Sequence, residues 1–246
     1  MFRFCWLSFL CCILTLAVGG CRHVDFSSVP LADELGLMDV QPVPREIVER
    51  YGPTAKDRLD EIRRQRKNAA KATAEVQEQL TEKLAQQIQA EPNPFLRQEI
   101  VRALTECQTP LAARILRAGL NDENTDVQIQ CCRGWGKWGT PESVQVLGEV
   151  LGNKVADLDV KIAAIDGLQK AAQVEAAPFL VPLLDKREDP ALQHKALSAL
   201  QNITGRDLPH DQEAWQAYVT NSLESTPGTE GSSVPSLVRQ TLFWWR

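Results

Sequence analysis

Cysteine and histidine are the side chains that could serve this chain in metal or nucleophilic chemistry. The chain has seven Cys and three His. His23, His194 and His210 each lack a second His or Cys at the spacing of a metal site. Cys131 and Cys132 are adjacent in a predicted helix, so their side chains point about 100° apart and do not converge on one ion. The sequence predicts no catalytic residues, metal site or cofactor site.

Cys21 stands in a different context, at the end of a pattern typical of secretory signals. Arg3 precedes an apolar run over residues 4–18, and Gly19 and Gly20 follow directly before the cysteine. The run is shorter than the roughly 20 residues that cross a hydrocarbon core, and no stop-transfer pattern follows it. Residues 1–20 are therefore predicted to be a signal peptide.

The segment Val18-Gly19-Gly20-Cys21 resembles the lipobox of bacterial lipoproteins, which has an aliphatic residue, two small residues and a cysteine. The resemblance implies cleavage before Cys21, lipidation of its thiol, and an extracytoplasmic location in the cell envelope. Two or three acyl chains would hold the protein at a membrane. An ordinary cleaved signal followed by an unrelated cysteine, or a retained signal anchor, are the alternatives. Which membrane carries the anchor stays open.

Charge and cysteine usage bound the rest of the chain. Without residues 1–20 it keeps 26 basic and 32 acidic residues, a net charge of −6, which gives no general attraction to nucleic acid. Cys107, Cys131 and Cys132 are the cysteines left for the folded part. Three cysteines without regular spacing are no disulfide framework and suit small apolar positions, with a Cys107 disulfide to Cys131 or Cys132 as the alternative.

Two segments precede the repeats. Residues 21–44 hold the lipid anchor and a Ser-, Pro- and Gly-containing tether, and residues 45–74 form a helical segment. Within it a short helix is predicted near residues 45–51, and Thr54 is predicted to cap a helix from Ala55 to about Lys67. A basic run there suits either a solvated helix face or contact with anionic lipid or cell-wall polymer; it comprises Arg63, Arg64, Arg66, Lys67 and Lys71.

Four segments of twelve residues align without a gap. They start at Asn93, Asn124, Asp157 and Asp189, which are 31, 33 and 32 residues apart. Each starting Asn or Asp suits a helix N-cap, and positions 4, 8 and 12 are apolar or small and share one helix face. An apolar-periodic stretch precedes each segment, at residues 76–90, 111–120, 143–151 and 176–184. The unit is a helix, a turn and a helix, and such units must stack to bury both faces.

These residues resemble HEAT-like repeats, in the short bacterial form whose second helix begins Asp-x-x-aliphatic-Arg. The resemblance covers residues 75–205, about four units, and implies an all-α, right-handed solenoid. Arg stands at the fifth position in the first unit alone, as Arg97, where Gln128, Lys161 and Gln193 occupy the others. The polar ladder usual at that position is therefore not expected throughout. Pro182 is expected to bend the first helix of the fourth unit.

The chain after the repeats divides into a cap and a tail. Residues 206–223 are predicted to be a capping helix begun by Asp211 and Glu213, with Trp215 and Tyr218 on one face. Residues 224–246 form a flexible linker and an aromatic tail. The tail suits packing onto the N-terminal helices, docking at a membrane surface, or binding a partner; its predicted membrane contacts are Leu242, Phe243, Trp244 and Trp245.

The leading functional hypothesis is a non-enzymatic, membrane-anchored scaffold that binds another envelope protein. No nucleic acid and no small-molecule substrate is expected. The polar positions of the second helices are the predicted partner contacts: Arg97, Arg102, Gln128, Arg133, Lys161 and Gln193. A structural envelope protein that contacts membrane or wall is the first alternative. The second is an enzyme, because some short HEAT-like proteins attach bilins to light-harvesting proteins.

Overall fold

The computed structural model describes residues 46, 50 and 52–224. The chain divides into two units, residues 1–52 and 53–246. The predicted signal peptide, the tether, Cys21 and the aromatic tail all lie outside the described residues, as does most of the predicted helix at residues 45–51. The predicted limits of the domains stay predictions.

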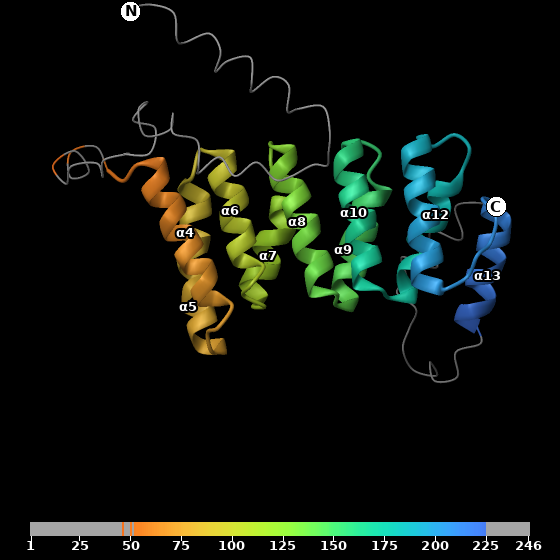
Figure 1. The fold of residues 1–246 in the computed structure, drawn as a ribbon, viewed down its shortest axis with the longest axis horizontal. Coiled ribbons are helices and arrows are strands. Elements are labelled where there is room, and N and C mark those ends of the chain that lie inside the picture. Colours follow the sequence, from red (N-terminus) through yellow and green to blue (C-terminus); the bar gives the residue numbers. More distant parts are fainter. Residues whose placement is uncertain (1–45, 47–49, 51, 225–246) are drawn as a thin grey trace, which may run out of the picture. The chain divides into compact units, whose positions relative to one another are not determined.

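The second unit consists of helix pairs arranged in two rows (Figure 1). The first-helix row holds α5 (Ala74–Ala90), α7 (Pro110–Gly119), α9 (Pro141–Gly152), a broken segment from Val174 to Leu184, and α13 (Gln212–Glu224). The second-helix row holds α4 (Ala55–Ala69), α6 (Pro94–Leu104), α8 (Thr125–Trp138), α10 (Leu158–Ala171) and α12 (Pro190–Thr204). The described residues are all-α, a solenoid of stacked helix pairs, as predicted.

The N-cap of every second helix in the four repeats is the residue with which its aligned segment begins. The side chains of Asn93, Asn124, Asp157 and Asp189 accept backbone hydrogen bonds from Phe95, Asp126, Asp159 and Ala191 at 3.0, 3.1, 3.0 and 2.7 Å. Each bond satisfies one of the donors that a helix start leaves open. Thr54 caps α4 as predicted, in a reciprocal pair with Asp57.

The core follows the predicted periodicity. Positions 4, 8 and 12 of the four aligned segments are at most 2% exposed in every case. They are Leu96, Ile100, Leu104, Val127, Cys131, Trp135, Val160, Ala164, Leu168, Leu192, Ala196 and Leu200. A twelve-residue pattern repeated along the chain therefore produces one continuous apolar layer between the two rows.

Two glycines set the spacing of the central helices α8 and α10. A Cβ atom built on Gly136 would lie 2.4 Å from the Cα of Gly167, and one on Gly167 would meet the carbonyl oxygen of Cys132 at 3.1 Å. Because backbone stands on both sides, no side chain can move aside to make room. The pair therefore fixes a close crossing of α8 and α10.

The first helix of the fourth repeat is not one helix. It consists of the 3-10 turn η2 (Val174–Ala176), the single α-turn α11 (Ala177–Leu180) and the 3-10 turn η3 (Val181–Leu184). The prediction of a helix merely bent at Pro182 was wrong, because Pro178 and Pro182 stand four residues apart and each removes a backbone donor. Leu180, Val181, Leu183 and Leu184 are nevertheless buried.

The last helix, α13, closes the apolar layer as predicted. Trp215 is fully buried, and its ring nitrogen donates a hydrogen bond to the carbonyl oxygen of Pro209 at 3.1 Å. Tyr218 packs edge-on against it at 6.0 Å between ring centres. The helix packs on α11 and η3, so it covers the end of the first-helix row.

Candidate interaction surface

Polar contacts join neighbouring helices of the second-helix row. Arg66 of α4 pairs with Glu99 of α6 at 3.9 Å, and Arg102 of α6 donates to Gln130 of α8 at 3.1 Å. Further along, Asp166 of α10 pairs with Lys195 of α12 at 2.7 Å. In the aligned segments these are contacts of position 10 with position 7 of the next repeat, apart from Arg66, which precedes the repeats.

This series of contacts between position 10 and position 7, called the ladder below, is interrupted between α8 and α10. Position 10 of α8 is Arg133, and position 7 of α10 is Ala163, which offers no polar group. Arg133 is exposed and makes no ion pair with any described residue. Lys170, near the end of α10, is likewise exposed without an ion pair among residues 52–224. Lys137 of α8 is tied to Glu106 at 2.5 Å.

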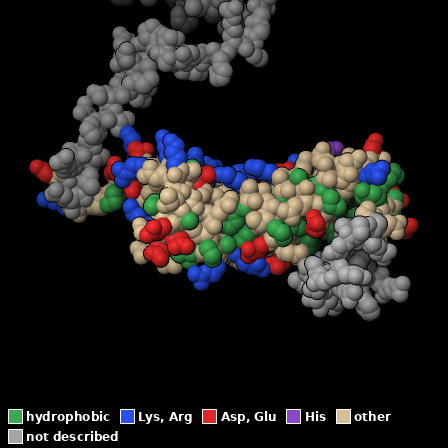
Figure 2. All heavy atoms as spheres, turned by 90° about the horizontal axis from the view of Figure 1, so that it is seen from below, with side chains coloured by type: hydrophobic (Ala, Val, Ile, Leu, Met, Phe, Trp, Pro, Cys, Tyr) green, Lys and Arg blue, Asp and Glu red, His purple; other side chains and the backbone are tan. Residues whose placement is uncertain are grey.

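Basic residues predominate in the second-helix row. Its five helices contain thirteen Lys and Arg and seven Asp and Glu, a net charge of +6. In the first-helix row, α5, α7, α9 and residues 174–184 contain three basic and six acidic residues, a net charge of −3. Figure 2 shows Lys and Arg gathered along the edge formed by the second-helix row. The two rows therefore present faces of opposite charge.

Arg97, the one arginine at the fifth position, is internal. Its guanidinium meets Asp122 in two hydrogen bonds of 2.9 and 3.0 Å, a geometry that raises the pKa of Arg97, and it donates to the Pro92 carbonyl at 3.0 Å. The residue is only 8% exposed. These bonds hold α6 to the loop of the next repeat, so its burial contradicts the partner contact predicted for it.

The other five predicted contacts differ in how far the protein itself engages them. Gln128 and Gln193 donate to carbonyl oxygens of the loops before their own helices, at Asp122 (2.5 Å) and Glu188 (2.7 Å). Lys161 is half-buried. Arg102 is held by Glu99 at 2.6 Å. Of the six, Arg133 alone is exposed and without an ion pair in the described chain.

Lys170 and the Asp166–Lys195 pair were missed by sequence reasoning. The signal of the pair was present in the same alignment, because position 10 reads Arg102, Arg133, Asp166 and Ser198 while position 7 reads Glu99, Gln130, Ala163 and Lys195. Asp166 and Lys195 have opposite signs in these two columns, whereas Lys170 lies beyond the twelve aligned positions.

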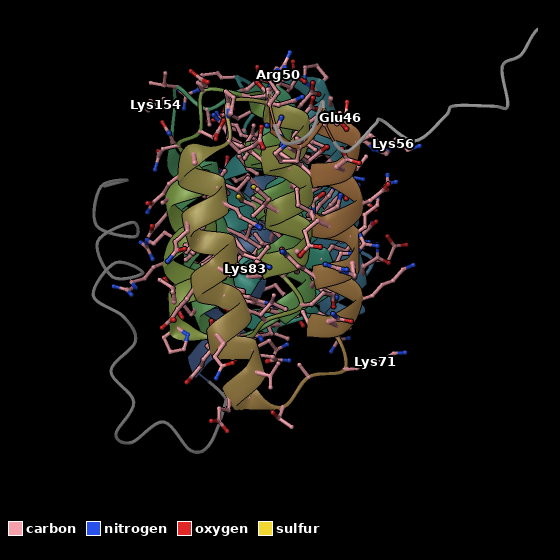
Figure 3. The ribbon with its side chains drawn as sticks, turned by 90° about the vertical axis from the view of Figure 1, so that its left-hand side faces the viewer. Glu46, Arg50, Lys56, Lys71, Lys83 and Lys154 are labelled. Carbon is pink, nitrogen blue, oxygen red and sulfur yellow. The ribbon has the colours of Figure 1, made fainter. Side chains whose placement is uncertain are left out.

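The basic run of α4 is partly used within the protein. Arg64 pairs with Glu61 and Arg66 with Glu99, so these two cations are engaged. Lys83 of α5 also reaches Glu61, at 3.2 Å, between the two helices (Figure 3). Lys71, just beyond the other end of α4, points into solvent in the same view. Arg63 and Lys67 are exposed as well.

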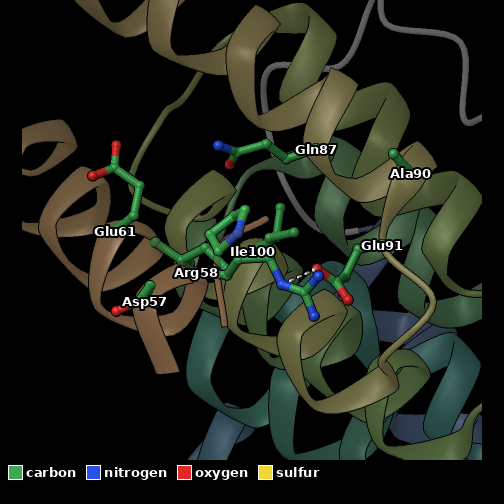
Figure 4. A pocket seen from close by; sticks show the side chains of 9 residues that line it. Asp57, Arg58, Glu61, Gln87, Ala90, Glu91 and Ile100 are labelled. Carbon is green, nitrogen blue, oxygen red and sulfur yellow. Dashed lines mark ion pairs between the residues drawn. The ribbon is translucent and has the colours of Figure 1, made fainter. Parts of the chain in front are cut away.

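A cavity of about 380 Å³ lies between α4, α5 and α6. Arg58 and Glu91 form an ion pair of 3.3 Å in its wall (Figure 4). Ile62 and Ile100 contribute apolar surface, and the side-chain oxygen of Gln87 is buried there without a hydrogen bond. The cavity is mostly apolar, and it contains no pair of side chains arranged as nucleophile and base.

The three cysteines of the repeats are buried free thiols. The alternative of a Cys107 disulfide with Cys131 or Cys132 was wrong, since all three are unpaired. Burial raises the pKa of each thiol, that of Cys132 to about 12. No group of three or more His, Cys, Asp or Glu within the described residues could hold a metal ion. The described helices include none that is long and apolar enough to span a bilayer.

Comparison with known proteins finds a similarity within the repeats. A family model described as HEAT repeats matches residues 81–159 and 113–201. No curated protein matches the chain. Among solved structures, the crystal structure of an engineered protein matches with 18% sequence identity and a TM-score of 0.41. The match covers 79% of this chain and 90% of the engineered chain.

Proposed function

We propose that this chain is a non-enzymatic scaffold that binds a protein partner through its second-helix row and is held in the bacterial cell envelope by a lipid on Cys21. HEAT repeats generally act as protein-interaction scaffolds, and stacked repeats offer extended surfaces rather than a single pocket. The observation that carries the proposal is the basic outward face of the second-helix row, with cations such as Arg133 left unpaired.

The anchor part rests on Val18-Gly19-Gly20-Cys21 and the apolar run before it. In cells, Cys21→Ser is expected to shift the protein from the membrane fraction to the soluble extracytoplasmic fraction, because the thiol that would take the lipid is gone. Cys12→Ser is the control, since Cys12 lies within the predicted signal and leaves with it. An unchanged membrane fraction in Cys21→Ser would contradict the anchor.

The scaffold part is tested by site-specific photo-cross-linking in intact cells. A photoreactive amino acid at His194, which is exposed on α12, is expected to give an adduct with one discrete protein. The same residue at Gln86, exposed on α5 of the first-helix row, is the matched control and is expected to give none. Equal labelling at both positions, or no adduct at His194, would contradict binding through the second-helix row.

A structural role against membrane or wall is the second candidate. It is favoured by Arg63, Lys67 and Lys71, which are exposed and make no ion pair among the described residues. Arg63→Glu with Lys67→Glu would then release a Cys21→Ser protein from envelope fragments. Arg114→Glu with Lys186→Glu is the control, since both of its positions are exposed elsewhere and the charge change is equal. Under the scaffold proposal neither variant changes the fractionation.

A further inference from the structure

We propose that Arg133 of α8 and Lys170 of α10, together with Ile129 and Ile162, form a docking site for an acidic protein segment with apolar side chains. The inference rests on the proposed scaffold function and names the chemistry of its partner. The site lies on the second-helix row, at the one step between repeats α6 to α12 where position 10 lacks a polar partner in the next described helix.

The cation of Arg133 is free to bind a partner because the contact between position 10 and position 7 is missing between α8 and α10. At the neighbouring steps, Arg102 is engaged by Gln130 and Glu99, and Lys195 by Asp166. At the position of α10 where a partner for Arg133 would stand, position 7, the residue is Ala163, which has no hydrogen-bond acceptor in its side chain. A carboxylate supplied from outside would meet an unpaired guanidinium, which can take it in two parallel hydrogen bonds.

Apolar surface adjoins these cations. Ile129 lies one helical turn before Arg133, and Ile162 occupies the same repeat position on α10. Both isoleucines are only partly buried, although they pack against the core. The corresponding residues of the outer repeats are polar, Gln98 and His194. The apolar pair is therefore confined to the step that also has the free cations, as expected of an interface centre.

The arrangement favours a polypeptide over a continuous polyanion. Asp166 lies one turn before Lys170 on α10 and stays on this face in its pair with Lys195. A nucleic acid or anionic bilayer would bring closely spaced phosphates against Asp166. A protein segment can place separate carboxylates at Arg133 and Lys170 and apolar side chains at the isoleucines. Charge and apolar surface are then matched together.

The site is also fixed in shape. Gly136 and Gly167 bring the backbones of α8 and α10 together beneath the face, and this close contact sets the distance between the two helices. Arg133 precedes Gly136, and Lys170 follows Gly167, by three residues each. A rigid spacing of the cations reduces the ordering cost of binding.

The test uses the full-length, detergent-solubilised protein and a fluorescein-labelled peptide of repeated Asp-Glu-Leu-Phe, followed by fluorescence anisotropy. Arg133→Glu with Lys170→Glu is expected to weaken binding at least about tenfold, since rim charge pairs are lost and reversed. Arg133→Gln with Lys170→Gln should give a smaller loss. Arg114→Glu with Lys186→Glu, which changes net charge equally at exposed positions elsewhere, should leave binding unchanged.

Four outcomes would overturn the docking site. The wild-type protein does not bind the peptide; both charge-reversal variants lose binding equally; phosphatidylglycerol vesicles or duplex DNA bind through Arg133 and Lys170 while the peptide does not; or a peptide with Ser for Leu and Phe binds equally well. The His194 cross-link separates the two proposals, because its persistence with a failed peptide test leaves the scaffold standing and removes this site.

Discussion

At the scale of single residues, Arg97 connects two repeats through one side chain. Two nitrogens of its guanidinium donate hydrogen bonds to the Asp122 carboxylate, and the third donates to the Pro92 carbonyl oxygen. The side chains of Arg97 and Asp122 are 10% and 14% exposed, so water replaces little of this contact if it is lost. The arginine that was predicted to contact a partner therefore holds two repeats together.

Arg97→Ala is expected to lower the free energy of unfolding by about 2 kcal/mol, because Asp122 is left nearly buried without its partner. Arg97→Lys keeps the charge but loses the fork, and should cost about 1 kcal/mol. Urea denaturation followed by circular dichroism measures both. Arg114→Ala, at an exposed position, is the control and should stay within about 0.5 kcal/mol of wild type. Equal stability of Arg97→Ala and Arg114→Ala would contradict the role of the contact.

The repeat cysteines are expected to be inert in the native protein. Burial disfavours the thiolate and raises the pKa of Cys132 to about 12, so the reactive form is absent at neutral pH. Iodoacetamide should modify Cys107, Cys131 and Cys132 only after denaturation, as read by mass spectrometry of their peptides. Gln108→Cys, at an exposed position next to Cys107, should react natively and serves as the control. Native alkylation of Cys131 or Cys132 would revive a chemical role for these thiols.

At the scale of elements, the contact of α8 with α10 depends on the absence of side chains. Gly136 and Gly167 bring backbone against backbone, whereas the steps on either side are joined by polar pairs. At the same step Arg133 faces Ala163 and has no matching acid. The close contact and the free charge of the proposed docking site therefore come from different residues of the same two helices.

Gly136→Ala is expected to destabilise the fold by about 2 kcal/mol, because the added Cβ overlaps the Gly167 backbone and the helices must separate. Gly152→Ala is the matched control, since a Cβ there meets no atom within 4 Å, and it should be neutral or stabilising by less than about 1 kcal/mol. Thermal and urea unfolding measure both variants. A Gly136→Ala protein as stable as Gly152→Ala would show that the crossing is not tight.

At the scale of the whole array, each helix pair buries its apolar faces against the neighbouring pairs, so the end pairs need another segment to cover theirs. The helix α13 provides one, since it packs on α11 and η3 and its Trp215 is fully buried. The broken segment there has only single turns of helix, which cannot be stable alone. Its order therefore depends on packing between α12 and α13.

Trp215→Ala is expected to unfold the end of the array first. The lost side chain costs about 3 to 5 kcal/mol locally, and in a stacked array the loss falls on the nearest repeat. Hydrogen exchange should show loss of protection in α13, residues 174–184 and α12, with α6 and α8 retained. Trp215→Phe, which keeps most of the buried area, should show less. Uniform loss of protection along the array would mean that the cap and the repeats unfold as one unit.

The sequence by itself determined the parts of this protein that depend on local residue order. The caps at Asn93, Asn124, Asp157 and Asp189 and the apolar positions of the second helices all follow from short patterns, since a helix start and an amphipathic face are local properties. The lipid anchor at Cys21 also rests on such a pattern, and stays a prediction.

Only the tertiary structure decided which polar side chains are free. Arg97 and Arg133 are both arginines of second helices, at positions 5 and 10 of the aligned segments, yet one is buried against Asp122 and the other is exposed opposite Ala163. Whether a charge is paired depends on the residue that a neighbouring repeat brings beside it, about thirty positions away in the chain. The break of the helix at Pro178 and Pro182 was settled in the same way, because burial of Leu180 and Leu183 stabilises turns that have little stability alone.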